Sequence, residues 1–409
     1  MNSSHHFNQK SEKEPDDKSC LKFIYKSFNE NTRCKLDDKK FTFMPTNEQE
    51  IDKLINELDN KASAGITGIS ASILKSTHQS IVPFLTKLFN DCINNGVVLD
   101  EWKAALITVL HKKGAKDDMN QYRGISILPL LAKIFEKVLA NQIKNYFINN
   151  NLLFSGQHGF REAHSCESAL HEIISKCLNN LDNKKINALL FVDFKKAFDM
   201  VDQSLLLYKL ANYGFDNKAI KLIKNYFTNR TLRVNFGTDG MSDIANLTLG
   251  VGQGSVLGPL FFVIFINDLP DHLTTIETKL FADDTTLIVA DECIHNCDIK
   301  LKRGLLLLSE WCKHNRLYIN WQKTYIMYIH NKRLTLPKSV EFDDKTIEVV
   351  SEFKLLGVTI DNKLNFDAFV AQQCSSINQR LYMIKRQYYL PEKVKTTFFK
   401  AFILPCFDN

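Results

Sequence analysis

Two adjacent carboxylates, Asp283 and Asp284, stand between two short segments of apolar or β-branched residues. The flanking segments, 279–282 and 285–289, are typical of β-strands, and an Asp-Asp pair is acceptable in a turn. The sequence therefore predicts a β-hairpin that carries both acids at its tip. Like charges this close repel each other, so a buried pair would retain a proton. A divalent cation would remove that conflict, and hard oxygen ligands suit Mg²⁺.

A third carboxylate, Asp193, follows the apolar segment 188–192 in a similar setting. Three acids delivered by two strands make a plausible two-metal site for phosphoryl transfer. The residues alone leave a second interpretation open. In that interpretation Asp193 caps a helix, and Asp283 with Asp284 forms a solvated turn.

The composition is that of a globular protein with more than one core. The chain has 409 residues, which exceeds the usual ceiling for a single core, so we expect two or three subdomains. A net charge of +6 is modest and leaves a nucleic-acid partner open, provided that the basic residues cluster. Ten cysteines occur without a CxxC pair, which argues against a disulfide framework and favours a reducing compartment. Cys293 to Cys297 faintly resembles a metal site, although an ordinary loop or helix is the favoured interpretation.

Targeting signals are not apparent in the sequence. The first 20 residues are polar and lack the apolar core of a secretory signal. The longest apolar stretch, 256–266, is too short to span a bilayer. We therefore expect an intracellular protein, in the cytoplasm or the nucleus, that is not secreted and has no membrane partner.

Helical and strand patterns alternate irregularly along the chain. Residues 1–40 are predicted to be a poorly ordered, flexible extension, and Thr46 with Gln49 has the spacing of a capping box before a first helix. Further predicted helices are 77–95, 130–149, 167–181, 203–213, 216–228, 297–315, 366–388 and 392–404. Further predicted strands are 104–110, 323–329 and short segments within 346–360. The pattern predicts an α+β fold with an antiparallel sheet and helices packed on one face.

Four separate segments then point to a family. They are 191–199 (FVDFKKAFD), 252–259 (GQGSVLGP), 281–284 (FADD) and 353–358 (FKLLGV), in this order. With this ordered series the chain resembles the reverse transcriptases of non-LTR (LINE-type) retrotransposons from about residue 41 to its end. One such motif would be weak support, whereas the series is specific.

The resemblance implies a right-hand polymerase with fingers, palm and thumb that copies an RNA template into DNA from a DNA primer and dNTPs. It implies two Mg²⁺ ions, with Mn²⁺ as a substitute, and a ribonucleoprotein. The implied divisions are a flexible extension at 1–40, fingers and palm at 41–361, and the start of a truncated thumb at 362–409. Family members carry an endonuclease upstream and further sequence downstream, so we expect a fragment of a longer element product.

The resemblance also assigns roles to the acids. Asp193 and Asp283 would ligate both metals, and Asp284 would complete the catalytic cluster. Because successive side chains of a strand point to opposite faces, we expect Asp284 to be the less direct ligand. Asp199 and Asp202 are expected to cap the helix that follows them.

Three residues match positions that surround the nucleotide in the family. Phe198, five residues after Asp193, matches the aromatic steric gate that excludes ribonucleotides, although a core phenylalanine is the alternative. Gln253 and Gly254 match the segment that lines the nucleotide pocket, although a plain turn before an apolar helix is the alternative. Glycine lets a backbone approach a ligand closely.

Three cationic side chains match positions that contact phosphates. Lys112 and Arg123 match residues that bind the incoming triphosphate, where Arg can bind in bidentate fashion. Lys323 matches a position that could neutralise or protonate the leaving pyrophosphate. Lys113 and Lys116 are expected to be solvated surface residues.

Template and primer contacts are assigned to other segments. Arg161 lies in a segment that resembles the template-abutting part of the family, and Leu356 with Gly357 matches the primer-grip hairpin. Residues 362–400 hold seven Lys or Arg against two Asp or Glu, which would suit a thumb helix beside duplex phosphates. An ordinary charged helix face is the alternative.

Some residues depart from the family pattern. Gly124 stands where the family commonly has Pro, Thr67 replaces a frequent Asp, and Cys166 occupies a usual Thr position. None of these departures touches the expected metal ligands, but they are compatible with an element copy of reduced activity. A catalytically inactive nucleic-acid-binding relic is one alternative function. An RNA-templated RNA polymerase is the other, because palms of that class also present an Asp-Asp hairpin.

Overall fold

The computed structural model describes residues 15–30, 40–111, 114–237 and 240–407. Two compact units are each assembled from separate stretches of chain. The first unit comprises residues 1–154, 194–272 and 309–318, and the second comprises 155–193, 273–308 and 319–409. The mixed helices and sheets of both units make an α+β protein.

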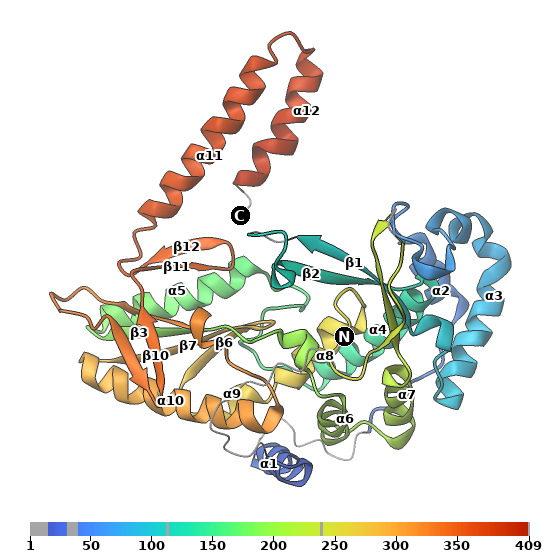
Figure 1. Ribbon diagram of the computed structural model, residues 1–409, viewed down its shortest axis with the longest axis horizontal. Coiled ribbons are helices and arrows are strands. Elements are labelled where there is room, and N and C mark those ends of the chain that lie inside the picture. Colours follow the sequence, from blue (N-terminus) through green and yellow to red (C-terminus); the bar gives the residue numbers. More distant parts are fainter. Residues whose placement is uncertain (1–14, 31–39, 112–113, 238–239, 408–409) are drawn as a thin grey trace. The chain divides into compact units, whose positions relative to one another are not determined.

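The first unit contains a four-stranded mixed sheet in the order β2-β1-β4-β5, in which β1 and β4 run parallel. Helix α8 is apolar along its whole length and almost entirely buried, and it contacts α4 and α6 (Figure 1). The strands are β1 (Ala104–His111), β2 (Tyr122–Ile127), β4 (Thr231–Asn235) and β5 (Ala245–Asn246). The helices are α1 (Asp17–Glu30), α2 (Glu48–Asn56), α3 (Ala71–Asn95), α4 (Leu130–Asn149), α6 (Gln203–Asn212), α7 (Asn217–Phe227), α8 (Leu257–Ile266) and α9 (Leu269–His272).

Helix α1 corrects the prediction of a poorly ordered extension, which is wrong for residues 17–30. Cys20, Ile24 and Phe28 recur every four residues and are buried, and α1 contacts α6. Arg316 also pairs with Asp17 near the start of this helix. The short apolar stripe is hidden in the sequence by the polar residues around it, and packing on α6 stabilises the helix.

The start of α2 lies one residue away from the predicted capping box. Asn47 is the N-cap, and its side chain accepts a hydrogen bond from the Glu50 backbone N–H at 2.9 Å. The Thr46 hydroxyl instead donates to the Glu50 carboxylate at 2.6 Å. The capping chemistry is therefore present, but the residue that accepts from the backbone is Asn47.

The second unit is built on a six-stranded sheet in the order β6-β7-β3-β8-β10-β9, followed by a separate β11–β12 hairpin. All neighbouring strands run antiparallel except β8 and β10, which are parallel. The strands are β3 (Ile186–Val192), β6 (Glu277–Phe281), β7 (Asp284–Asp291), β8 (Tyr325–Ile329), β9 (Ser339–Phe342), β10 (Lys345–Val349), β11 (Glu352–Leu355) and β12 (Val358–Asp361). The helices are α5 (Cys166–Asp182), α11 (Asp367–Arg386), α12 (Glu392–Phe402) and α10 (Ile294–Asn315), which belongs to this unit up to residue 308.

Helices cover both faces of the six-stranded sheet, so the prediction of helices on one face is wrong. Leu189 and Phe191 pack in a core cluster with α5 and the β11–β12 hairpin. On the opposite side lies α10, whose Cys297 thiol donates to the Ile186 carbonyl at 3.5 Å (Figure 1). Every residue of β3 is buried, which is what a central strand covered on both faces requires.

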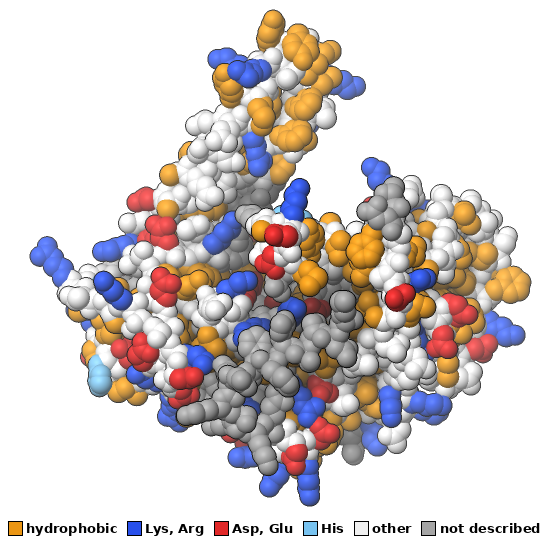
Figure 2. Space-filling model, in the orientation of Figure 1, with side chains coloured by type: hydrophobic (Ala, Val, Ile, Leu, Met, Phe, Trp, Pro, Cys, Tyr) orange, Lys and Arg blue, Asp and Glu red, His pale blue; other side chains and the backbone are white. Residues whose placement is uncertain are grey.

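Helices α11 and α12 contact each other and have no buried residue in their described lengths. Tyr382, Met383, Tyr388 and Tyr389 are exposed in or just after α11. Figure 2 shows hydrophobic side chains gathered towards the tip of this helical hairpin. None of the described helices of the chain is long and apolar enough to cross a membrane.

Candidate functional site

The Asp283–Asp284 segment forms the predicted β-hairpin. Phe281 pairs with Asp284 across β6 and β7, which leaves Ala282 and Asp283 as a two-residue turn. Ala282 has a φ of 56°, a left-handed backbone conformation that non-glycine residues seldom adopt. Asp283 is half-buried and Asp284 is exposed. The two acids therefore lie at the end of a hairpin whose turn is conformationally strained.

Strand pairing brings Asp193 to the same place. The antiparallel register of β3 with β7 ends at the pair Val192 and Thr285. The next residue along β3 is therefore at the end of β7 where the acidic turn begins. Asp193 is close enough to Asp283 and Asp284 for their charges to interact, although it is 90 residues distant from Asp283 in the sequence.

The other two carboxylates disturb the ionisation of Asp284. The pKa of Asp284 is raised to about 6, first by partial loss of hydration and then by the negative charges of Asp283 and Asp193. Asp284 is exposed at its surface, so hydration is only partly lost and solvent still screens these charges. The ends of the neighbouring strands β3 and β7 thus hold excess negative charge.

Asn320 holds Asp193 in position. Its side-chain amide donates to Asp193 Oδ2 at 2.7 Å, and its backbone N–H donates to the Asp193 carbonyl at 2.7 Å. The predicted residue Lys323 lies three residues further on, exposed at the end of a 3₁₀ turn. Asn320 and Lys323 both match a motif that follows the acidic hairpin in the resembled family, but that match assigned a role to Lys323 alone and gave no indication that Asn320 would orient a carboxylate.

A hard divalent cation suits the donor atoms at this edge. All three acids offer oxygen, and a cation would relieve the repulsion that raises the pKa of Asp284. Among the residues that the structure describes, no group of three or more His, Cys, Asp or Glu side chains is arranged to hold a metal ion. Mg²⁺ commonly binds through one or two carboxylates together with substrate phosphates and water, so a complete cage is not required. The Cys293–Cys297 segment offers no such site, since Cys297 is buried against β3.

Phe198 lies in the first unit, in the 3₁₀ turn Ala197–Met200. Its half-buried ring stacks on Phe262 of α8, with ring centroids 4.5 Å apart and planes inclined by 21°. The Val251 backbone N–H donates to its carbonyl at 2.8 Å. The stacking fixes the plane of the ring while part of it stays accessible.

The 252–255 loop is joined to β2, a strand at the edge of its sheet. The Ser126 backbone N–H donates to the Gln253 carbonyl at 2.7 Å. Gly254 has a φ of 105°, and a Cβ at this position would lie 2.4 Å from the Ser126 carbonyl oxygen, so only glycine fits here. The Gln253 side chain donates to Asp199 Oδ1 at 3.1 Å. Asp199 therefore binds this loop, and the prediction that it caps the following helix is not supported.

One other prediction is confirmed near this loop. Asp202 is the N-cap of α6, as predicted, and accepts from the Ser204 and Leu205 backbone N–H groups. Arg123 is exposed on β2, three residues before Ser126. Lys112 and Lys113 lie outside the described residues.

The template and primer predictions fall on two segments of the second unit. The Arg161 guanidinium donates to the Gln157 carbonyl at 3.0 Å. Leu356 and Gly357 form the turn of the β11–β12 hairpin, with φ values of 48° and 95°. Leu356 packs against the core cluster, whereas a Cβ on Gly357 would meet nothing within 4 Å. Leu356 is therefore held by packing, whereas the space beside Gly357 is open.

Comparison with known proteins decides the family. The model of the family described as "Reverse transcriptase (RNA-dependent DNA polymerase)" matches residues 110–360. The chain belongs to the reverse transcriptase family. This match spans the three acids and the loops described above.

Three of its relatives come from Drosophila melanogaster. The probable RNA-directed DNA polymerase from transposon BS is 29% identical over 83% of this chain and 38% of its own length. The RNA-directed DNA polymerase from mobile element jockey is 28% identical over 88% of this chain and 40% of its own length. The probable polymerase from transposon X-element is 27% identical, with 87% and 40% covered. The predicted resemblance to non-LTR reverse transcriptases is confirmed, and the chain spans about two fifths of these relatives.

The reverse transcriptase chain also contains a buried acid that the sequence did not reveal. Glu136 of α4 is 2% exposed and accepts from the Tyr226 hydroxyl at 2.8 Å. Its other oxygen accepts from the Val256 and Leu257 N–H groups at 2.6 and 3.2 Å. Burial raises the pKa of Glu136, although Arg230 opposes the shift. The residue thereby anchors the N-terminus of α8, immediately after the 252–255 loop.

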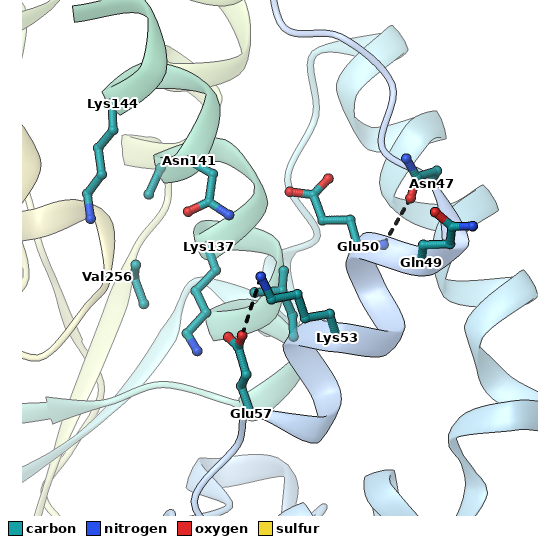
Figure 3. Close-up of a pocket in the computed structure, with 11 residues that line it drawn as sticks. Asn47, Gln49, Glu50, Lys53, Glu57, Lys137, Asn141, Lys144 and Val256 are labelled. Atoms are coloured by element: carbon teal, nitrogen blue, oxygen red, sulfur yellow. Dashed lines mark hydrogen bonds and ion pairs between the residues drawn. The ribbon is translucent and has the colours of Figure 1, made fainter. Parts of the chain in front are cut away.

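A recess of about 570 Å³ also lies in the first unit, between α2 and α4 (Figure 3). Lys53, Lys137 and Lys144 line it, and Lys53 pairs with Glu57 at 3.8 Å. None of the predicted site residues lines this recess. Its lysines and glutamates largely balance, so it does not resemble the acidic edge of the second unit.

Proposed function

We propose that this chain is an RNA-directed DNA polymerase of a non-LTR retrotransposon. It would extend the 3′-hydroxyl of a DNA primer with dNTPs on an RNA template. The observation that carries this proposal is the convergence of Asp193, Asp283 and Asp284 at one edge of the six-stranded sheet. Membership of the reverse transcriptase family supports the same chemistry. As part of an element ribonucleoprotein, the chain would act in the cytoplasm or the nucleus.

The proposal includes a right-hand architecture. The six-stranded sheet would serve as the palm, the four-stranded sheet would belong to the fingers, and α11 with α12 would begin the thumb. The fingers and palm would span residues 41–361, and the thumb would begin at residue 362. Loops positioned by a rigid scaffold are where binding and catalytic residues are concentrated.

The acids would hold the metal. When bound, two Mg²⁺ ions, or Mn²⁺ in their place, would activate the primer hydroxyl and neutralise the charge of the leaving pyrophosphate. Asp193 and Asp283 would be the main ligands, and Asp284 would complete the cluster. Asn320 would keep Asp193 oriented, because it fixes both the carboxylate and the backbone of that residue. Most of the rate gain would come from positioning and charge stabilisation.

The remaining predicted residues would bind substrates. Arg123 and Lys112 would bind the triphosphate, and Lys323 would assist the leaving group. Phe198 would press against the sugar, and its stacking on Phe262 supports a ring held in one plane. Gln253 and Gly254 would line the nucleotide pocket. Arg161 would contact the template, and Leu356 with Gly357 would contact the primer. These contacts would be largely to the nucleic-acid backbones, because a polymerase must ignore sequence.

Primer extension on an RNA template tests the proposal. The wild-type chain should extend a DNA primer with dNTPs in the presence of Mg²⁺, and Asp283→Ala should not. Binding of the template–primer duplex without extension by the wild-type chain would contradict the proposal and favour a catalytically inactive relic.

A second arm tests the choice of sugar. The wild-type chain should discriminate against ribonucleoside triphosphates, and Phe198→Val should incorporate them more readily. Efficient incorporation of ribonucleotides by the wild-type chain would favour an RNA-templated RNA polymerase.

A further inference from the structure

A short segment before α5 runs alongside the strand that leads into the acidic turn. The Leu280 backbone N–H donates to the Gly156 carbonyl at 2.9 Å, and the His158 N–H donates to the Leu280 carbonyl at 2.8 Å. Gln157 therefore forms a parallel bridge with Leu280 at the outer edge of β6. This segment extends the sheet at the point where the hairpin turns.

The side chain of Gln157 continues from this bridge to the turn itself. Its Oε1 accepts from the Ala282 backbone N–H at 3.1 Å and from the Gly159 N–H at 2.8 Å. Gln157 is 1% exposed, and among the described residues its Nε2 has no hydrogen-bond partner. The hydrogen bonds of the Gln157 side chain are therefore the two that its Oε1 accepts from backbone N–H groups.

The turn needs such a contact. Ala282 has a left-handed backbone and immediately precedes Asp283, so a change in its φ would redirect the Asp283 side chain. Gly159 lies directly against it, and a Cβ there would lie 2.3 Å from the Ala282 nitrogen. No larger residue fits at 159 unless the turn moves.

The segment is anchored on its other side as well. His158 is buried, and its Nδ1 is 2.8 Å from the Ser168 hydroxyl of α5. Lys279 of β6 donates to Glu172 of α5 at 2.6 Å. These contacts attach the segment and β6 to the same helix, so Gln157 contacts the turn from a fixed base.

We propose that Gln157 is a positioning residue, which orients Asp283 for the reaction by holding the Ala282 N–H. The inference rests on the proposed function, since it assigns Gln157 a part in the reaction of Asp283. Gln157 itself would touch neither substrate nor metal. Arg161, the predicted template contact, donates to the Gln157 carbonyl, so template binding and the acidic turn share one anchor.

Gln157→Leu removes the acceptor while retaining a side chain of similar size. Gln142→Leu is the matched control, because the Gln142 amide also bridges a backbone, accepting from and donating to Met44 at 2.8 and 2.9 Å in the first unit. Folding of each variant is checked by far-UV circular dichroism. If Gln157→Leu does not fold, Gln157→Asn, which keeps an amide that is too short to reach the turn, receives the same tests.

The first measurement is hydrogen exchange in the metal-free protein. The Ala282 amide should exchange about tenfold faster in the Gln157 variant and should be unaffected in the Gln142 variant. Unchanged exchange at Ala282 would overturn the proposal. This measurement does not depend on whether the chain polymerises DNA.

The second measurement is the single-turnover rate of primer extension. The Gln157 variant should lose about 10- to 100-fold in this rate, with the KM for dNTP and the affinity for the duplex changed little. A loss that disappears when the rate is expressed per folded molecule, or one matched by weaker substrate binding, would show a merely structural role and overturn the proposal. Failure of the wild-type chain to extend the primer would refute the proposed function instead, while the exchange measurement would still test the contact.

Discussion

Two charged groups of residues in this molecule differ in how their charges are compensated. In the second unit, Asp193, Asp283 and Asp284 gather at a sheet edge and raise the pKa of Asp284 to about 6. In the first unit, Lys209 and Asp268 are both buried, and the ammonium lies 2.6 Å from Asp268 Oδ1. The same ammonium also donates to the Phe265 carbonyl at 2.6 Å.

The difference separates stability from chemistry. A buried ion pair with further hydrogen bonds compensates its own charge, so it can fix packing while offering nothing to a ligand. Like charges gathered at an accessible edge are unfavourable for the folded protein alone and are relieved by a bound cation. Disturbing the buried ion pair should therefore change the free energy of unfolding, and disturbing the acidic cluster should change the rate of reaction.

The largest effect is expected from Asp193→Asn. The variant keeps the shape of the side chain but removes the charge of a proposed metal ligand, so primer extension should fall by about a thousandfold or more. Its free energy of unfolding should not decrease, because one of three mutually repelling charges is lost. Asp291→Asn is the matched control, since Asp291 lies at the other end of β7 and pairs with Lys300. Extension by Asp193→Asn at the control's rate would contradict the assignment of this residue.

The buried pair should show the opposite behaviour. Lys209→Met leaves the Asp268 carboxylate buried without its cation, which should lower the free energy of unfolding by about 3–5 kcal/mol in urea denaturation. The extension rate per folded molecule should change little. Adding Asp268→Leu to Lys209→Met should recover much of the stability, because the uncompensated charge is then absent. A large loss of rate in the folded variant would mean that the two regions are not separable in this way.

Glu136 stands between the two cases, because it is buried like Lys209 yet anchors the loop that holds Gln253. Glu136→Leu leaves the Val256 and Leu257 N–H groups without their acceptor and should cost about 1–3 kcal/mol of unfolding free energy. The KM for dNTP should also rise, since the loop precedes this helix start. Measuring both quantities for the one variant tests the link. A stability loss with an unchanged KM would assign Glu136 to packing alone.

The sequence predicted the elements whose signals are local. The helix at 130–149 was predicted at its observed bounds because its apolar residues recur at helical spacing. The hairpin that carries Asp283 and Asp284 was predicted because two strand-like segments flank acceptable turn residues. The family motifs then indicated that Asp193 belongs with them, which local patterns alone left open.

The features that the sequence did not predict depend on residues that are distant in the sequence. The buried stripe of α1 becomes stable only against α6, and the second covered face of β3 depends on α10. Gln157 and Asn320 acquire their roles from backbones and carboxylates more than 100 residues away. Glu136 did leave a weak signal, because it lies on the buried side of its helix with Ala132 and Ile143. Its partners could not be inferred from that position.

The smallest predicted effect concerns the pH dependence of stability, and it tests whether the acidic edge is repulsive in the metal-free protein. The pKa of Asp284 is raised from an ordinary value of 3.8 to about 6, so between these pH values the folded state binds more protons than the unfolded state. The unfavourable contribution is therefore absent below pH 3.8, grows as the pH rises, and is complete above about pH 6.

Asp284→Asn should be more stable than the wild-type chain at pH 7.5 in EDTA, by on the order of 1 kcal/mol or less, since Asp284 is exposed and solvent screens it. The two should unfold alike near pH 3.5, and added Mg²⁺ should reduce the difference at pH 7.5 by stabilising the wild-type chain. A variant that is less stable than the wild-type chain at pH 7.5 would mean that the acids are already compensated, and the contrast with the Lys209–Asp268 pair would then disappear.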